Sequence, residues 1–188
     1  MSDCVGNPVC YNTLMTRTVK SEAIVLRKRS LLKKDTIVTL FTERSGKINV
    51  LAKGIKKITS RRLPHTETGN LINVILYRKD ERYFLQETKL ISAFSQIKKD
   101  QKKLVYFYLF LFILERLLPE NAKEIKVYQL AKSFLVALSK KDLGEDGLCS
   151  YLNKLLSVLG YLKGEKTLPE IKLFVEEIIN EKIPSLSI

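Results

Sequence analysis

Three strand-like runs lie close together between residues 20 and 62 of this chain. Two of them, residues 36–42 and 47–53, are rich in β-branched and aliphatic residues and flank the pair Ser45-Gly46. Such a pair between two runs of this kind is typical of the tight turn of a β-hairpin. The third run, residues 23–26, precedes them. We therefore expect half of a β-barrel here.

This segment also holds most of the net positive charge, since residues 20–62 contain 13 Lys or Arg against 3 Asp or Glu. The triplet Arg27, Lys28 and Arg29 directly follows the first run. In the last run, strand alternation separates two faces, with Ile48, Val50 and Ala52 on one and Lys47, Asn49, Leu51 and Lys53 on the other. One face is therefore expected to be buried and the other to be solvated and cationic.

The next segment, residues 55–64, carries Lys56, Lys57, Arg61 and Arg62, and no acidic residue occurs between positions 46 and 66. We interpret it as a basic loop or one helical turn, and an ordinary solvated connection is the alternative. The lone His65 follows Pro64, where we expect a solvated loop residue. Residues 69–78 and 83–94 then resemble a second hairpin. Five strands with a long third connection indicate a small Greek-key barrel of the oligonucleotide-binding type.

From residue 96 the pattern changes to that of helices, which we expect at residues 104–118, 121–141, 148–161 and 168–183. The first contains eleven consecutive apolar residues, 104–114. A membrane span needs about 20, so we interpret this segment as a helix buried on all sides. The fold class is therefore α+β, with a five-stranded OB-fold barrel at 19–95 and an all-helical domain at 96–188. Residues 1–18 are expected to be a disordered leader, and Met15 is an alternative start to Met1.

The charge is unevenly distributed. The formal net charge is +13, and residues 1–97 hold 18 Lys or Arg against 8 Asp or Glu, whereas residues 98–188 hold 15 against 12. A basic surface attracts polyanions, so nucleic acid, an anionic membrane surface and an acidic protein tail are all open as partners.

No pattern of catalytic or metal-binding residues is found. Cys4, Cys10 and Cys149 form no C-x-x-C pair, and His65 is the one histidine. The sequence also lacks H-E-x-x-H, P-loop and G-x-S-x-G motifs, and it shows no signal-peptide pattern. We therefore predict a cytoplasmic protein with reduced thiols, without catalytic residues, metal or cofactor.

The order of several motifs resembles the family of the bacterial DNA repair protein RecO between residue 19 and about residue 161. These motifs are EAIVLRKR, DTIVTLFTERSGKINVLAKG, KKITSRR and, in the helical half, LLSVLGY. The matching positions are Val25, Leu26, Asp35, Leu40, Thr42, Gly46, Ala52, Lys53, Gly54, Ser60, Arg61, Leu159, Gly160 and Tyr161. The resemblance implies an OB-fold followed by helices in a protein that binds single- and double-stranded DNA. It also implies strand annealing, association with RecR, contact with the tail of the single-strand-binding protein, and help in loading RecA.

The sequence departs from the family in three places. Many members carry a cysteine-ligated zinc module after Leu-Gly-Tyr, and residues 162–188 contain no cysteine, so no zinc is expected. Lys33 or Lys34 stands where relatives tend to have an acidic residue. Leu148, Cys149 and Ser150 stand where some relatives have arginines suited to the acidic tail of the single-strand-binding protein.

Lysines and arginines of the basic segment are the predicted DNA contacts, because each phosphate that they neutralise releases counterions. They are Arg27, Lys28, Arg29, Lys33, Lys34, Lys47, Lys53, Lys56, Lys57, Arg61 and Arg62. Phe41, Tyr77, Tyr83 and Phe84 are available for base stacking, with a core position equally open for each. Two other functions stay open: a protein adaptor whose basic face receives an acidic tail, and an RNA-binding barrel of the translation machinery.

Overall fold

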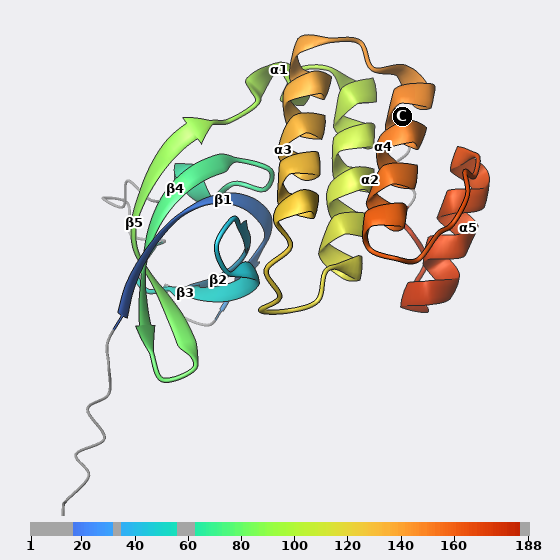
Figure 1. Ribbon diagram of the computed structural model, residues 1–188. Coiled ribbons are helices and arrows are strands. Elements are labelled where there is room, and N and C mark those ends of the chain that lie inside the picture. The colour runs from blue at the N-terminus through green and yellow to red at the C-terminus, as the bar shows by residue number, and fades with distance from the viewer. Residues whose placement is uncertain (1–16, 32–34, 56–62, 185–188) are drawn as a thin grey trace, which may run out of the picture.

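The N-terminal half of the chain is a closed barrel of five strands. The computed structural model describes residues 17–31, 35–55 and 63–184. The strands are β1 (Arg17–Ser30), β2 (Thr36–Thr42), β3 (Gly46–Ala52), β4 (Leu71–Lys79) and β5 (Arg82–Ser92). They close in the order β1-β2-β3-β5-β4, with β3 and β5 parallel and the other pairs antiparallel. The predicted OB-fold barrel followed by helices is thereby confirmed (Figure 1).

Alternating side chains of all five strands fill the barrel. Ile48, Val50 and Ala52 of β3 are almost completely buried, as the alternation predicts, and Val25 and Val38 join them from β1 and β2. Lys47, Asn49, Leu51 and Lys53 lie on the opposite face, half-buried or exposed. The strands thus have one buried and one outward face, as expected for a half-solvated antiparallel sheet.

The helical half lies along one side of the barrel. It contains α1 (Ser95–Lys98), α2 (Gln101–Leu117), α3 (Ile125–Lys140), α4 (Gly144–Val158) and α5 (Leu168–Ile179), and the 3-10 helix η1 (Pro64–Thr66) precedes β4. In Figure 1, α3, α2, α4 and α5 stand side by side, with α3 next to the barrel. Among the described residues, no helix combines the length and apolar content that a membrane crossing requires.

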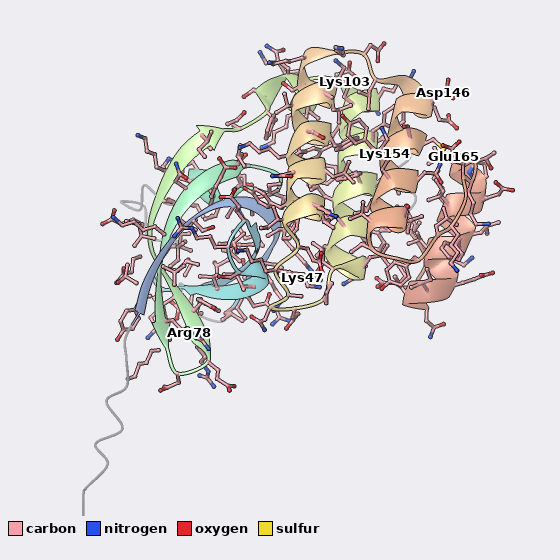
Figure 2. The ribbon with its side chains drawn as sticks, in the orientation of Figure 1. Lys47, Arg78, Lys103, Asp146, Lys154 and Glu165 are labelled. Carbon is pink, nitrogen blue, oxygen red and sulfur yellow. The ribbon has the colours of Figure 1, made fainter. Side chains whose placement is uncertain are left out.

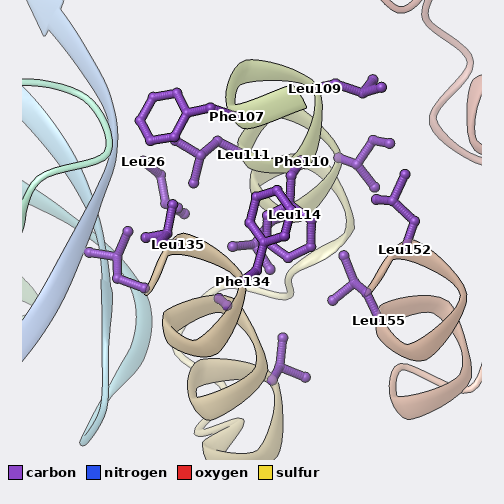
Figure 3. Packing of buried hydrophobic residues seen from close by; sticks show 14 of the residues in the cluster. Leu26, Phe107, Leu109, Phe110, Leu111, Leu114, Phe134, Leu135, Leu152 and Leu155 are labelled. Carbon is purple, nitrogen blue, oxygen red and sulfur yellow. The ribbon is translucent and has the colours of Figure 1, made fainter. Parts of the chain in front are cut away.

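One apolar core joins the helices to the outer wall of the barrel. Ile24, Leu26 and Phe41 point out of the barrel and belong to the same buried cluster as the helices. Figure 3 shows Leu26 close to Phe107 and Leu135. Deeper in the helical half, the rings of Phe110 and Phe134 stack with centroids 4.0 Å apart. Because this packing is continuous, it fixes the position of the helical half against strands β1 and β2.

The first strand is longer than predicted. β1 pairs with β4 along its first half and with β2 along its second half, with a bulge between Val25 and Arg27. The predicted run at residues 23–26 is only its centre. The basic triplet at residues 27–29 therefore lies within the strand instead of after it. The predicted leader, residues 1–18, overlaps the strand, because Arg17 and Thr18 belong to β1 and pair with Arg78 and Tyr77 of β4. Residues 1–16 lie outside the described residues.

Several helix boundaries also differ from the prediction. α3 begins at Ile125 instead of residue 121, because Asn121 has a positive φ of 57° and donates its backbone N–H to the carbonyl oxygen of Lys47. α4 begins earlier, at Gly144. α5 ends at Ile179, where Asn180 takes a left-handed conformation and the chain turns back so that Ile183 N–H reaches Glu176.

Three apolar residues are more exposed than predicted. Tyr108 is 39% exposed, so α2 is not buried on all sides. Ile125 and Ile178, which the helical apolar pattern of residues 121–141 and 168–183 predicts to face inward, are 42% and 36% exposed. Ile125 is the first residue of α3, before the buried face of that helix begins, and Ile178 lies in the last turn of α5.

Candidate nucleic-acid interface

A hollow of about 260 Å³ lies on the outer face of β1, β2 and β3, where the barrel meets the end of α2. We call it the junction hollow. Strand register places its lining residues together, since Arg27 is opposite Thr39 and Thr39 is opposite Asn49. The eight residues lining it are Arg27, Arg29, Ile37, Thr39, Lys47, Asn49, Glu115 and Glu120.

The basic triplet is divided between two faces of β1. Arg27 and Arg29 line the junction hollow, opposite Thr39 and Ile37. Lys28 lies opposite the buried Val38, and its ammonium group pairs with Glu67, outside the hollow. Two of the three charges, at most, therefore act at the junction hollow.

Polar side chains cross the floor of the hollow in a line. The Thr39 hydroxyl donates to Asn49 Oδ1 at 2.8 Å, and the Asn49 amide donates to Glu120 Oε1 at 3.0 Å. This line runs from β2 through β3 to the residues after α2. It fixes the orientation of the Asn49 side chain on the outward face of the barrel.

Lys47 has a structural contact. Its ammonium group donates to the main-chain carbonyl oxygen of Glu115 at 2.9 Å, in the last turn of α2. The last carbonyl groups of a helix lack intrahelical partners and carry a partial negative charge, so a lysine there is stabilising. Lys47 is therefore held against the helix, and its charge is partly compensated.

The two arginines are the most accessible cations of the junction hollow. The Arg27 side chain is 54% exposed, and its guanidinium lies 4.0 Å from the carboxylate of Glu115. Glu115 is also 3.2 Å from Arg116, which competes for the same carboxylate. Arg29 is exposed and forms no ion pair with the part of the chain that the structure describes. Arg29, with Arg27 beside it, is thus best placed to meet a phosphate.

The predicted contact residues fall into three groups. Arg27, Arg29 and Lys47 come together in the junction hollow. Lys28 lies elsewhere on β1, and Lys53 lies past the end of β3, with its ammonium group 5.1 Å from the centre of the Phe84 ring. Lys33, Lys34, Lys56, Lys57, Arg61 and Arg62 lie outside the described residues, so their role stays a prediction.

None of the four aromatic candidates for base stacking lines the junction hollow. Phe41 is fully buried and packs edge-on against Tyr128 with ring centroids 5.4 Å apart, so it offers no stacking surface. Tyr77 and Phe84 are cross-strand neighbours with centroids 6.2 Å apart. They are half-buried, as is Tyr83, and none of the three lines the junction hollow.

The acidic residues of the hollow were not anticipated from the sequence. Glu115 and Glu120 belong to the helical half and lie about 70 residues from their partners Lys47 and Asn49. No local pattern predicts such a contact. Asn49, by contrast, was already placed on the outward face by the alternation of β3.

The structure corrects the interpretation of His65. Its side chain is half-buried, and Nδ1 lies 2.9 Å from the Thr88 hydroxyl and 3.2 Å from the Thr88 carbonyl oxygen. His65 therefore connects η1 to β5 instead of being a solvated loop residue. Among the described residues, no three His, Cys, Asp or Glu side chains are grouped to hold a metal ion. Cys149 is a free thiol, and Cys4 and Cys10 lie outside the described residues.

Comparison with known proteins gives consistent matches. Residues 15–94, which include the whole barrel, match the family described as recombination protein O N terminal. A DNA repair protein RecO of Caldanaerobacter subterraneus is 33% identical over 147 residues, which is 78% of this chain and 60% of the relative. The RecO of a Thermoanaerobacter species is 31% identical over 147 residues, covering 78% and 59% of the two chains. The RecO of Acetivibrio thermocellus is 27% identical over 144 residues, covering 76% and 57%. The chain thus spans less than two thirds of the length of these relatives.

Proposed function

The chain belongs to the RecO family, and from this we propose that it is a non-catalytic DNA-binding protein of repair and recombination. The observation that carries the proposal is the exposed pair Arg27 and Arg29 on the outward face of β1, beside β2 and β3. This is the side on which OB-folds bind oligonucleotides, between the loops that join the first two and the last two strands. A barrel that binds a strand here needs cationic side chains and no reacting group.

We propose that phosphate contacts supply most of the affinity. Arg27 and Arg29 contact the backbone, and Asn49, whose amide is already oriented, offers a polar contact at the floor of the junction hollow. Glu115 and Glu120 reduce the local positive charge and so limit how tightly a strand is held. Binding of this kind is independent of base sequence and weakens as salt rises.

The same electrostatics supports binding of both single- and double-stranded DNA and the annealing of complementary strands. Two strands held near one cationic surface repel each other less than in free solution, because the protein charges compensate their phosphates. Annealing then requires no chemical step by the protein.

The family membership also leads us to propose partners. These are RecR, the acidic tail of the single-strand-binding protein, and RecA, whose loading on DNA the protein would assist. The support for these three partners is that the chain belongs to the RecO family. The helix α4 carries Leu148, Cys149 and Ser150 on its middle turns, so a tail contact there would have to rely on other cations.

A salt titration of DNA binding tests the proposal. Fluorescence anisotropy of a labelled single strand and of the matching duplex is measured between about 50 and 200 mM salt. We expect log K to fall linearly with log salt for both. A protein adaptor would show no such slope. Competition between DNA and RNA strands of equal length separates the RNA-binding alternative, for which RNA would be preferred.

A further inference from the structure

A second hollow lies next to the junction hollow and is larger, about 570 Å³. We call it the turn hollow. It is bordered by the β2–β3 turn, the β4–β5 hairpin and the α2–α3 connection. Its lining residues are Arg44, Ser45, Arg78, Glu81, Tyr83, Asn121 and Lys123. Three of these seven are cations and one is a carboxylate, and none of the three cations is among the predicted DNA contacts.

Each cation of the turn hollow comes from a different part of the chain. Arg44 lies in the β2–β3 turn, Arg78 near the end of β4, and Lys123 between α2 and α3. Figure 2 shows Arg78 near the tip of the β4–β5 hairpin and Lys47 at the junction with the helical half. Like charges from three separate segments repel one another, so their convergence favours an anionic ligand between them.

The walls of the turn hollow are firmly positioned. The backbone N–H of Asn121 donates to the carbonyl oxygen of Lys47 at 2.9 Å, which ties the α2–α3 connection to β3. The β2–β3 turn is closed by the Thr42 hydroxyl, which accepts from Ser45 N–H and donates to the Gly46 carbonyl, each at 3.0 Å. The hollow is therefore formed before any ligand arrives.

The cations themselves remain available. Arg78 rests on Tyr83, with its guanidinium 5.7 Å from the ring centre, and donates through Nε to the Asp80 carbonyl at 3.3 Å. Its terminal amino groups have no hydrogen-bond partner among the described residues. Arg44 and Lys123 are exposed. None of the three forms an ion pair with a residue that the structure describes.

The two hollows are lined by residues that are close in the chain. Lys47 and Glu120 line the junction hollow, and the nearby Ser45 and Asn121 line the turn hollow. A long ligand that continues from one hollow to the other can meet Arg27 and Arg29 in the first and Arg44, Arg78 and Lys123 in the second. A nucleic-acid backbone has regularly repeated negative charges and suits such a track better than a compact anion.

We infer that the turn hollow binds backbone phosphates of a nucleic-acid strand that continues from the junction hollow. This inference rests on the proposed function and extends it, because it assigns Arg44, Arg78 and Lys123 to the binding surface. The strand then stays on the barrel and also passes the α2–α3 connection.

The test compares single strands of two lengths, about 6 and about 20 nucleotides, because one OB-fold occupies about 4 to 16. The variant Arg44→Ala/Lys123→Ala removes two exposed cations, with Arg44→Gln/Lys123→Gln as a second version. Lys140→Ala/Lys172→Ala is the matched control, since both lysines are exposed on helices away from the two hollows. Thermal unfolding verifies that each variant is folded.

We expect the turn-hollow variants to reduce the affinity gained on going from the short to the long strand. Their slope of log K against log salt on the long strand should fall by about 0.7 for each phosphate that the variant no longer neutralises. The control should leave both quantities unchanged. If the turn-hollow variants leave the salt slope and the length dependence unchanged while Arg27→Ala/Arg29→Ala reduces binding, this inference is overturned and the proposed function stands. If the unaltered chain shows no salt-dependent binding, both are overturned.

Discussion

The ammonium group of Lys47 donates a hydrogen bond to the main-chain carbonyl oxygen of Glu115 across 2.9 Å. The two residues are 68 positions apart, one near the start of β3 and the other in the last turn of α2. The contact satisfies a helix carbonyl and brings Glu115 to the edge of the junction hollow. Lys47 thus connects the stability of the junction between barrel and helices to the charge of the proposed interface.

Replacing Lys47 by alanine should destabilise the protein. A hydrogen bond from a charged group contributes about 1.5 to 3 kcal/mol, and Lys47 is only half-buried, so we expect a loss of about 1 kcal/mol. Urea unfolding measures it. Arg29→Ala is the control, because this exposed arginine has no ion pair in the described residues and should change stability by less than about 0.5 kcal/mol. Equal stability of the two variants would contradict the role of the contact.

Adjacent positions of the basic triplet should differ in DNA binding. Arg29→Ala should lower the salt slope on single strands by about 0.7, the value for one neutralised phosphate. Lys28→Ala removes the same charge one residue away, but Lys28 pairs with Glu67 outside the junction hollow. Its slope should stay unchanged in the same anisotropy titration. A similar decrease for both would show that the triplet acts as one patch.

The barrel was predictable because strand alternation is a local signal. The pattern at residues 47–53 places Ile48, Val50 and Ala52 inside, and hydrophobic burial enforces the same arrangement. The extent of β1 was not predictable, because its first half is held by pairing with β4, about 50 residues later in the chain. The local sequence does not indicate this pairing.

The candidate site was predictable only in part for a similar reason. Charge density identifies the basic segment, but it does not state which cations are already neutralised. Lys28 pairs with Glu67, and Lys47 donates a hydrogen bond to the end of α2. Both contacts join segments that are distant in the sequence. The start of α3 shows the same limit, because the pairing of Asn121 with Lys47 prevents the helix from beginning there.

Gly46→Ala should be strongly destabilising. Gly46 has a positive φ of 69°, and an added Cβ would lie 1.8 Å from the carbonyl oxygen of Ala122. Left-handed strain of about 1 to 2 kcal/mol then adds to a displacement of backbone at the barrel–helix junction, so we expect about 2 to 5 kcal/mol in total. Urea unfolding measures the loss.

Gly160→Ala separates the cost of left-handed backbone strain from the cost of the close approach to Ala122. Gly160 also has a positive φ, 81°, but an added Cβ would meet nothing within 4 Å. The strain is therefore present without the close approach, and we expect a loss of about 1 to 2 kcal/mol. If both glycine variants lose the same free energy of unfolding, the proximity of Ala122 contributes nothing.

Tyr128→Phe should reduce stability in a pH-dependent way. The Tyr128 hydroxyl donates to Glu22 Oε1 at 2.9 Å, and Lys132 reaches the same oxygen at 2.7 Å. Burial, and then the bond to Glu22, raise the pKa of the Tyr128 phenol above its ordinary value of 10.0. The folded state therefore keeps this proton when the unfolded chain loses it, so the stabilisation is complete below pH 10.0 and decreases as pH rises beyond it.

At neutral pH we expect the variant to lose about 1 to 2 kcal/mol, because a hydrogen bond to a charged group contributes about 1.5 to 3 kcal/mol and this one is only partly buried. The difference between the unaltered chain and Tyr128→Phe should then shrink as pH rises above 10.0, because the phenylalanine has no proton to lose. Chemical unfolding from neutral pH to about pH 11 measures both quantities. Tyr161→Phe is the control, since Tyr161 is 42% exposed and its hydroxyl has no hydrogen-bond partner within the described ranges. A difference that stays constant over this range would show that folding does not raise the pKa of the Tyr128 phenol.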